Sequence, residues 1–147
     1  MNILEKINND VIMAMKSGEK SMLSTLRMAK NAIQMDKIKL NHELSNEEII
    51  TTLKRQVKQK EDSIVEYTKY NKMDTVEELK KEIAIIKAYL PEELSIDDIN
   101  KGLDEIFLQV KPTGMKDMKI LMSEADKLFG VRADKKTLSE LIRSRLN

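Results

Sequence analysis

The 147-residue sequence contains no cysteine, and this absence removes several classes of chemistry. Without thiols there is no disulfide framework, no thiolate metal site and no cysteine nucleophile. A chain that uses no cysteine suits a reducing compartment, so we expect a cytoplasmic protein.

Long apolar runs are also missing. The longest run extends only from Val11 to Met15, whereas the apolar core of a signal peptide needs at least about seven residues and a membrane-spanning helix about twenty. We therefore expect neither a membrane span nor a cleaved signal peptide, and no membrane partner.

Glycine, proline and aromatic residues are scarce as well. The sequence has four Gly, two Pro and 3% aromatic residues, whereas 35% of its residues are charged. This composition, with apolar residues recurring at intervals of three and four, predicts an all-α protein. His42 is the single histidine and no glycine-rich phosphate loop is present, so we predict no catalytic residue, no metal site and no cofactor.

The apolar spacing predicts about four helices in the first 90 residues. The first covers residues 3–17, with Asn2 as its N-cap and Gly18 as its end. The second begins near Met22 and fades across residues 38–43.

Two capping boxes mark the predicted starts of the next two helices. Ser45 with Glu48 begins a long third helix that runs to about Tyr70, and Thr75 with Glu78 begins the fourth.

Pro91 is the strongest break in the helical pattern, because proline cannot donate a backbone hydrogen bond and restricts the residue before it. We therefore predict an N-terminal helical domain over 1–90 and a C-terminal three-helix domain over 91–147. The three helices of the second domain are predicted to begin after Ser95 and to cover about 115–129 and 135–146.

Charge is segregated along the chain. Residues 111–147 hold nine Lys or Arg and five Asp or Glu, a net charge of +4, whereas residues 74–110 hold four and ten, a net charge of −6. The C-terminal end is therefore the basic end.

The helix predicted over 115–129 has two distinct faces at about 100° per residue. The face predicted to be buried holds Met118, Leu121, Met122, Ala125, Leu128 and Phe129. The opposite face holds Lys116, Lys119, Ser123 and Lys127. These lysines form either a binding surface for an anionic partner or an ordinary solvated helix face.

The turn after this helix concentrates further cations. Gly130 suits a left-handed C-cap and Asp134 an N-cap, so both have architectural explanations. Arg132 has no such role and lies in a loop. Lys135 and Lys136 occupy a first helical turn, which the helix dipole makes unfavourable for cations.

Three basic side chains have alternative explanations. Lys136, Glu140 and Arg143, at spacings of four and three, suit an ordinary ion-pair ladder. Lys60 falls on the apolar face of the third helix, so we expect its stem to pack and its ammonium to reach water.

Five stretches of the chain carry a family resemblance. They are "AMKSGEKSMLSTLRM" at 14–28, "KQKEDSI" at 58–64, "YLPEELS" at 89–95, "KDMKILM" at 116–122 and "GVRADKK" at 130–136. In this order they resemble the YqeY family along essentially the full length. The last third also resembles the tail domain of GatB, the B subunit of the glutamine-dependent tRNA amidotransferase.

This resemblance implies an N-terminal helical domain and a smaller three-helix domain that helps to engage tRNA. In the amidotransferase, catalysis resides in the amidase subunit and in the metal- and ATP-using part of the B subunit, and none of that machinery is in these residues. A carbon–nitrogen ligase activity with glutamine as amido-N donor would therefore need other subunits.

The chain departs from the family pattern at the basic end. Lys119 and Ser123 stand where the family usually has glycines, Val131 is inserted, and Lys135 replaces the second glycine of the usual "GRADGK". Glycines on an exposed face would let an RNA backbone approach closely. Here we expect lysine charge to substitute for that proximity.

We predict a non-catalytic protein whose C-terminal domain binds structured RNA, with tRNA as the first candidate, mainly through phosphate contacts. The predicted contact residues are Lys116, Lys119, Lys127, Arg132, Lys135, Lys136, Arg143 and Arg145. Arg145 is the weakest member, because it falls toward the apolar side of the last turn. The alternatives are a protein-interaction adaptor that uses the third helix or residues 74–110, and, last, an amidotransferase-like enzyme.

Overall fold

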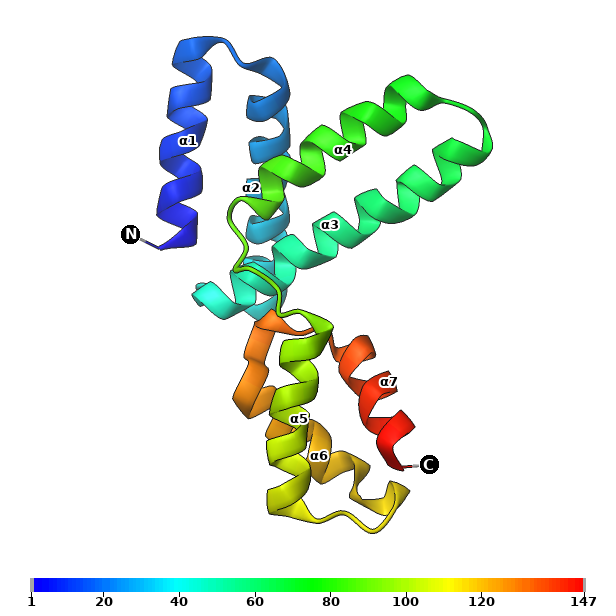
Figure 1. Ribbon diagram of the computed structural model, residues 1–147. Helices are drawn as coiled ribbons and strands as arrows, with labels where there is room; N and C mark the ends of the chain where they lie inside the picture. The colour runs from blue at the N-terminus through cyan, green and yellow to red at the C-terminus, as the bar shows by residue number, and fades with distance from the viewer. Residues whose placement is uncertain (1, 147) are drawn as a thin grey trace. The chain divides into compact units, whose positions relative to one another are not determined.

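The computed structural model describes residues 2–146, and within this range it contains seven α-helices, two short 3-10 helices and no β-strand (Figure 1). The all-α prediction is therefore confirmed. Contacts divide the chain into two compact units: unit 1 ends at Leu90 and unit 2 begins at Pro91. In the described range, no helix combines the length and apolar character needed to cross a bilayer.

Unit 1 is built from two pairs of helices. They are α1 (Ile3–Ser17), α2 (Lys20–Leu40), α3 (Asn46–Lys69) and α4 (Met73–Lys87). α1 packs along α2 and α3 along α4, and α2 also contacts both α3 and α4 (Figure 1). Their apolar faces meet in one core of buried residues, which includes Ile7, Val11, Leu26, Ala29, Ile33, Ile49, Leu53, Val57 and Ile86.

The ends of α1 and the start of α3 follow the predicted capping chemistry. Asn2 Oδ1 accepts a hydrogen bond from the Glu5 backbone N–H at 2.8 Å, and Gly18 adopts φ 75° beyond the last turn. Ser45 and Glu48 exchange both bonds of a capping box, at 3.2 and 3.0 Å. The predicted caps at Asn2, Gly18 and Ser45 are therefore confirmed.

The predicted start of α4 is wrong. The helix begins at Met73, so Thr75 lies inside its first turn and does not cap it. Glu78 instead accepts a hydrogen bond from the Ser21 hydroxyl of α2 at 2.6 Å. The Glu78 carboxylate therefore bonds to a residue of another helix and does not complete the predicted capping box.

Lys60 packs on the apolar face of α3 as predicted, but its ammonium has a partner that the sequence did not indicate. Its side chain is only 8% exposed, and its ammonium lies 3.4 Å from a carboxylate oxygen of Glu82, itself 15% exposed. The side chain is therefore largely enclosed. It forms an ion pair between α3 and α4, which satisfies a charge that would otherwise be costly to bury.

Unit 2 contains α5 (Ile96–Val110), the 3-10 turn η1 (Met115–Asp117), α6 (Met118–Phe129), the 3-10 turn η2 (Gly130–Arg132) and α7 (Lys135–Leu146). Ser95 caps α5 as predicted, since its hydroxyl accepts from the Asp98 N–H at 3.1 Å. α6 packs against α5 and α7. The core of unit 2 consists of Ile99, Leu103, Ile106, Leu121, Ala125, Phe129, Ala133, Leu138 and Ile142.

Gly102 allows α6 to approach α5 closely. A Cβ atom at this position would lie 2.5 Å from Cζ of Phe129, well inside van der Waals contact. Phe129 is the last residue of α6 and is 6% exposed. The missing side chain therefore makes room for the ring that anchors the end of α6 beside the basic turn.

α6 differs from its prediction in two respects. Residues 115–117 form a 3-10 turn before the α-helix begins, and Asp117 closes the preceding loop by accepting from the Thr113 N–H at 2.8 Å. Leu128, predicted to be buried, is 52% exposed. It lies at the edge of the buried face, whereas Leu121, Ala125 and Phe129 are buried as predicted.

Candidate nucleic-acid interface

One face of α6 presents its cations to solvent. Lys119, Ser123 and Lys127 are exposed and follow one another at intervals of four, whereas Leu121 and Ala125 are buried on the other side. Residues four apart share one face of an α-helix. Lys116, also exposed, lies in η1 immediately before this face begins.

Most of the predicted contact residues have no acidic partner. Lys127 lies 3.4 Å from Glu124, and Arg145 lies 2.6 Å from Asp104. The other six form no ion pair with any residue of the described range 2–146, and we call them the unpaired cations: Lys116, Lys119, Arg132, Lys135, Lys136 and Arg143. All six are exposed.

Two caps were predicted for the turn between α6 and α7, and only the N-cap of α7 is confirmed. Asp134 caps α7, because its carboxylate accepts from the Thr137 N–H at 3.1 Å. Gly130 does have a positive φ of 58°, but its ψ of −134° lies outside the left-handed helical region that we predicted. The chain therefore leaves α6 through a 3-10 turn, a backbone path that favours glycine at this position.

Arg132 has an architectural role that the sequence did not indicate. Its carbonyl oxygen accepts from the Leu94 N–H at 2.9 Å, and its Nε donates to the Glu92 carbonyl oxygen at 3.4 Å. These bonds hold the segment that enters α5 against the basic turn. The prediction that Arg132 lacks a structural duty is therefore wrong, although its side chain is exposed.

Lys135 and Lys136 begin α7 at its positive dipole end. The alternative ladder through Glu140 to Arg143 is not formed, since no ion pair joins these side chains in the part of the chain that is described. Neither lysine therefore forms an ion pair within the described range, and the acid nearest in sequence, Asp134, caps the helix.

Arg145 belongs to a different environment from the unpaired cations. Its Nη1 contacts Asp104 at 2.6 Å, and its Nη2 donates to the carbonyl oxygen of Asn100 at 3.0 Å. The guanidinium also lies 5.4 Å from the centre of the Phe107 ring. Arg145 thus ties α7 to α5 and is the predicted contact residue least available to a partner.

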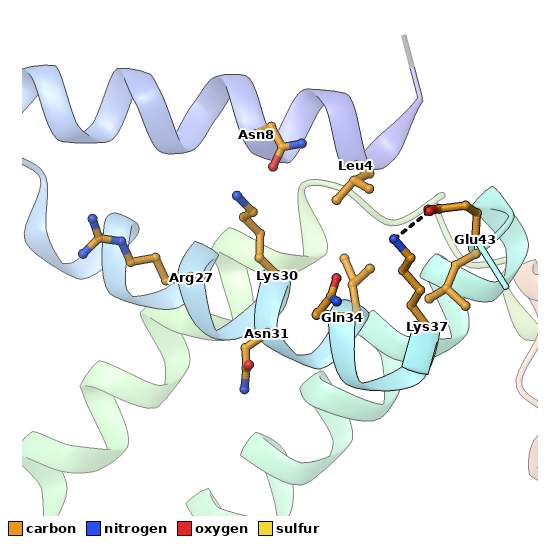
Figure 2. Close-up of a pocket in the computed structure, with 10 residues that line it drawn as sticks. Leu4, Asn8, Arg27, Lys30, Asn31, Gln34, Lys37 and Glu43 are labelled. Atoms are coloured by element: carbon orange, nitrogen blue, oxygen red, sulfur yellow. Dashed lines mark ion pairs between the residues drawn. The ribbon is translucent and has the colours of Figure 1, made fainter. Parts of the chain in front are cut away.

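A second basic site escaped the sequence reasoning. A cleft between α1 and α2 is lined by Arg27, Lys30, Gln34 and Lys37, with Asn8 on the opposite helix (Figure 2). The sequence did contain the pattern, because these α2 residues recur at intervals of three, four and three and so share one face of the helix.

Across residues 2–146, no three histidine or acidic side chains gather closely enough to hold a metal ion.

The sequence matches the model of a known protein family. Residues 4–146 match the model of the family described as Yqey-like protein, which is nearly the whole sequence. No curated protein matches the chain at a significant level.

Proposed function

The chain belongs to the YqeY-like family, and we propose that it is a non-catalytic RNA-binding protein whose unit 2 engages tRNA in the manner of the tail domain of GatB. The observation that carries the proposal is the set of unpaired cations. Six exposed cations on η1, α6, η2 and α7 have no ion pair within residues 2–146. A polyanionic backbone is the partner whose chemistry fits such a surface.

The scarcity of aromatic side chains favours recognition of RNA shape. Unit 2 contains two aromatic residues, Phe107 and Phe129. Phe129 is buried in the core, and the Phe107 ring faces the Arg145 guanidinium. Neither offers an open face on which an unpaired base would stack, so contacts to phosphates and sugars of a folded RNA suit this surface better.

The decisive experiment is a charge reversal on α6. Lys119→Glu with Lys127→Glu inverts the exposed face while leaving the buried face unchanged. We expect the affinity for a tRNA transcript, measured by fluorescence anisotropy, to fall at least about tenfold. The thermal unfolding midpoint should stay close to that of the wild type, because both side chains are exposed.

Lys58→Glu with Lys81→Glu is the matched control, since these two exposed lysines of unit 1 produce the same change in net charge. The control should retain most of the affinity. Equal losses in the two variants, or wild-type binding that does not weaken with salt, would show that the surface of unit 2 does not recognise RNA.

A protein-interaction adaptor is the second candidate, favoured by exposed apolar residues where α3 ends and α4 begins. Val65, Tyr70 and Met73 are 59%, 68% and 45% exposed, and a protein partner could cover these apolar side chains. A partner captured by the full chain that survives nuclease and about 0.5 M salt, which screens exposed charges strongly, would support the adaptor. Loss of the partner on nuclease treatment would support the RNA-binding proposal.

We further propose that the two units are independent domains, residues 1–90 and 91–147. Each unit has its own buried apolar core, which supports independent folding. Residues 91–147 expressed alone should give a cooperative thermal transition by circular dichroism and retain salt-dependent tRNA binding. A non-cooperative melt would refute the independence of unit 2 without bearing on RNA binding by the full chain.

A further inference from the structure

The open cleft between α1 and α2 lies in unit 1 and contains no residue of the proposed RNA surface. Its volume is about 510 Å³, within the range typical of small-molecule sites. Figure 2 shows Asn8 reaching from α1 toward Lys30 of α2, with Arg27 further along the same helix. Most of the lining side chains are polar, and Leu4, Ile33 and Leu44 add apolar surface.

Two of the cations that line the cleft are not compensated. Lys37 forms an ion pair with Glu43 at 2.6 Å, drawn as the dashed line in Figure 2. Arg27 and Lys30 form no ion pair with another residue among 2–146. They are three residues apart on α2, so both can reach one anionic group, and the planar Arg27 fork can bind two of its oxygens.

Asn8 indicates a second property of a ligand for this cleft, a hydrogen-bond donor. Its Oδ1 is buried and accepts no hydrogen bond from any described residue. A buried polar atom without a partner is unfavourable and is rare in folded proteins. An anion cannot satisfy it, because Oδ1 needs a donor. A ligand that carries a hydroxyl as well as negative charge would supply that donor.

We propose that this cleft binds a small phosphate monoester that also carries hydroxyl groups, the class that contains sugar phosphates and nucleotides. A phosphate monoester carries about −1.5 to −2 charges at neutral pH, which matches two cations better than the single charge of a carboxylate. The phosphate would lie on Arg27 and Lys30, and a hydroxyl would donate to Asn8 Oδ1. The side-chain amides of Asn31 and Gln34 also line the cleft and can serve further hydroxyls.

The binding test uses the full-length protein and three probes: ribose 5-phosphate, inorganic phosphate and ribose. Amide chemical shifts of the protein labelled with nitrogen-15 report where each probe binds. We expect ribose 5-phosphate to saturate with a dissociation constant below about 1 mM and to shift amides of α1 and α2. Inorganic phosphate should bind more weakly at the same place, and ribose should not bind.

Three variants test the assignment of roles. Arg27→Gln with Lys30→Gln should weaken ribose 5-phosphate at least about tenfold, whereas the control Lys58→Gln with Lys81→Gln should not. Asn8→Leu should weaken ribose 5-phosphate but not inorganic phosphate. It should also raise the thermal unfolding midpoint of the free protein, because it removes the unsatisfied acceptor.

Absence of saturable binding by ribose 5-phosphate, or equal binding by the cleft variant and its control, would overturn the proposal. So would a tRNA titration that shifts the amides around Arg27 and Lys30 while ribose 5-phosphate leaves them unchanged, since the cleft would then serve RNA. Because the proposed RNA surface lies in unit 2, loss of tRNA binding in the α6 variant neither supports nor refutes this site.

Discussion

Lys60 and Arg55 of unit 1 have different surroundings from the unpaired cations of unit 2. In unit 1, Lys60 pairs with Glu82 and Arg55 with Asp36, and both pairs join two helices. In the C-terminal part of unit 2, the six unpaired cations have no acidic partner among the described residues. The number of lysines and arginines in a segment therefore says little about function. What distinguishes an available cation from a structural one is the neighbour that the fold provides.

The strongest test of this contrast removes one partner of the buried pair. Glu82→Leu leaves the Lys60 ammonium buried without an acid, so we expect the free energy of unfolding to fall by about 3 kcal/mol. Lys119→Met on α6 removes an exposed cation that forms no ion pair in the described range, and it should change the free energy of unfolding by less than about 0.5 kcal/mol. Urea denaturation of both variants measures the difference.

A double substitution checks that the loss comes from the stranded charge. Lys60→Met with Glu82→Leu replaces both partners by apolar side chains of similar size, so stability should return to within about 1 kcal/mol of the wild type. A double variant as unstable as Glu82→Leu would mean that packing and not charge sets the cost.

The pair of Asp36 and Arg55 should give unit 1 a pH dependence. Hydrogen bonds from the Thr52 hydroxyl and the Arg55 guanidinium, both 2.6 Å long, hold the pKa of Asp36 below its ordinary value of 3.8. A carboxyl whose pKa is lowered by folding stabilises the protein above its unfolded-state pKa. This stabilisation is lost as the pH falls through the lower folded-state value.

Asp36→Asn should therefore reduce the free energy of unfolding by about 1.5 kcal/mol at pH 7 and flatten its decline below about pH 4. Urea denaturation between neutral and acidic pH measures both effects. The matched control is Asp126→Asn, an exposed aspartate of α6, which should change neither. An unchanged acid limb in Asp36→Asn would show that other carboxylates dominate acid unfolding.

Within α7, Arg145 and Arg143 provide a smaller version of the same comparison. Arg145 contacts Asp104, the Asn100 carbonyl and the Phe107 ring, whereas Arg143 is one of the unpaired cations. Arg145→Gln should lower the free energy of unfolding by about 1 kcal/mol. Arg143→Gln should leave the free energy of unfolding unchanged and should weaken tRNA binding more than Arg145→Gln does. The reverse order in either measurement would mean that contacts with α5 do not determine the role of Arg145.

The sequence predicted those features that depend on neighbours along the chain. The caps at Asn2, Ser45 and Asp134 are local exchanges of one or two hydrogen bonds, and each is confirmed. Helical periodicity likewise placed Lys119 and Lys127 on the exposed side of α6. Such features follow from the spacing of residue types, without knowledge of which helices pack together.

The features that escaped prediction depend on distant partners. Glu78 accepts a hydrogen bond from Ser21 on another helix, and the Lys60 ammonium forms an ion pair with Glu82. Arg132 donates to the carbonyl oxygen of Glu92, 40 residues away in the sequence. The cleft that joins Asn8 to Arg27 and Lys30 also needs two helices to be placed side by side. Periodicity gives the face of each helix but not the identity of what lies opposite.

The finest test compares two lysines on the same face of α6. Lys127 lies 3.4 Å from Glu124, and Lys119 has no ion pair in the described range. Replacing Lys119 by Gln should lower the slope of log affinity for tRNA against log salt by about 0.7 to 0.9, the value for one phosphate contact. Lys127→Gln should lower it by less, because Glu124 already compensates part of that charge, and Glu124→Gln should strengthen binding. Equal slopes for the two lysine variants would show that a neighbouring acid does not govern which cations reach the RNA.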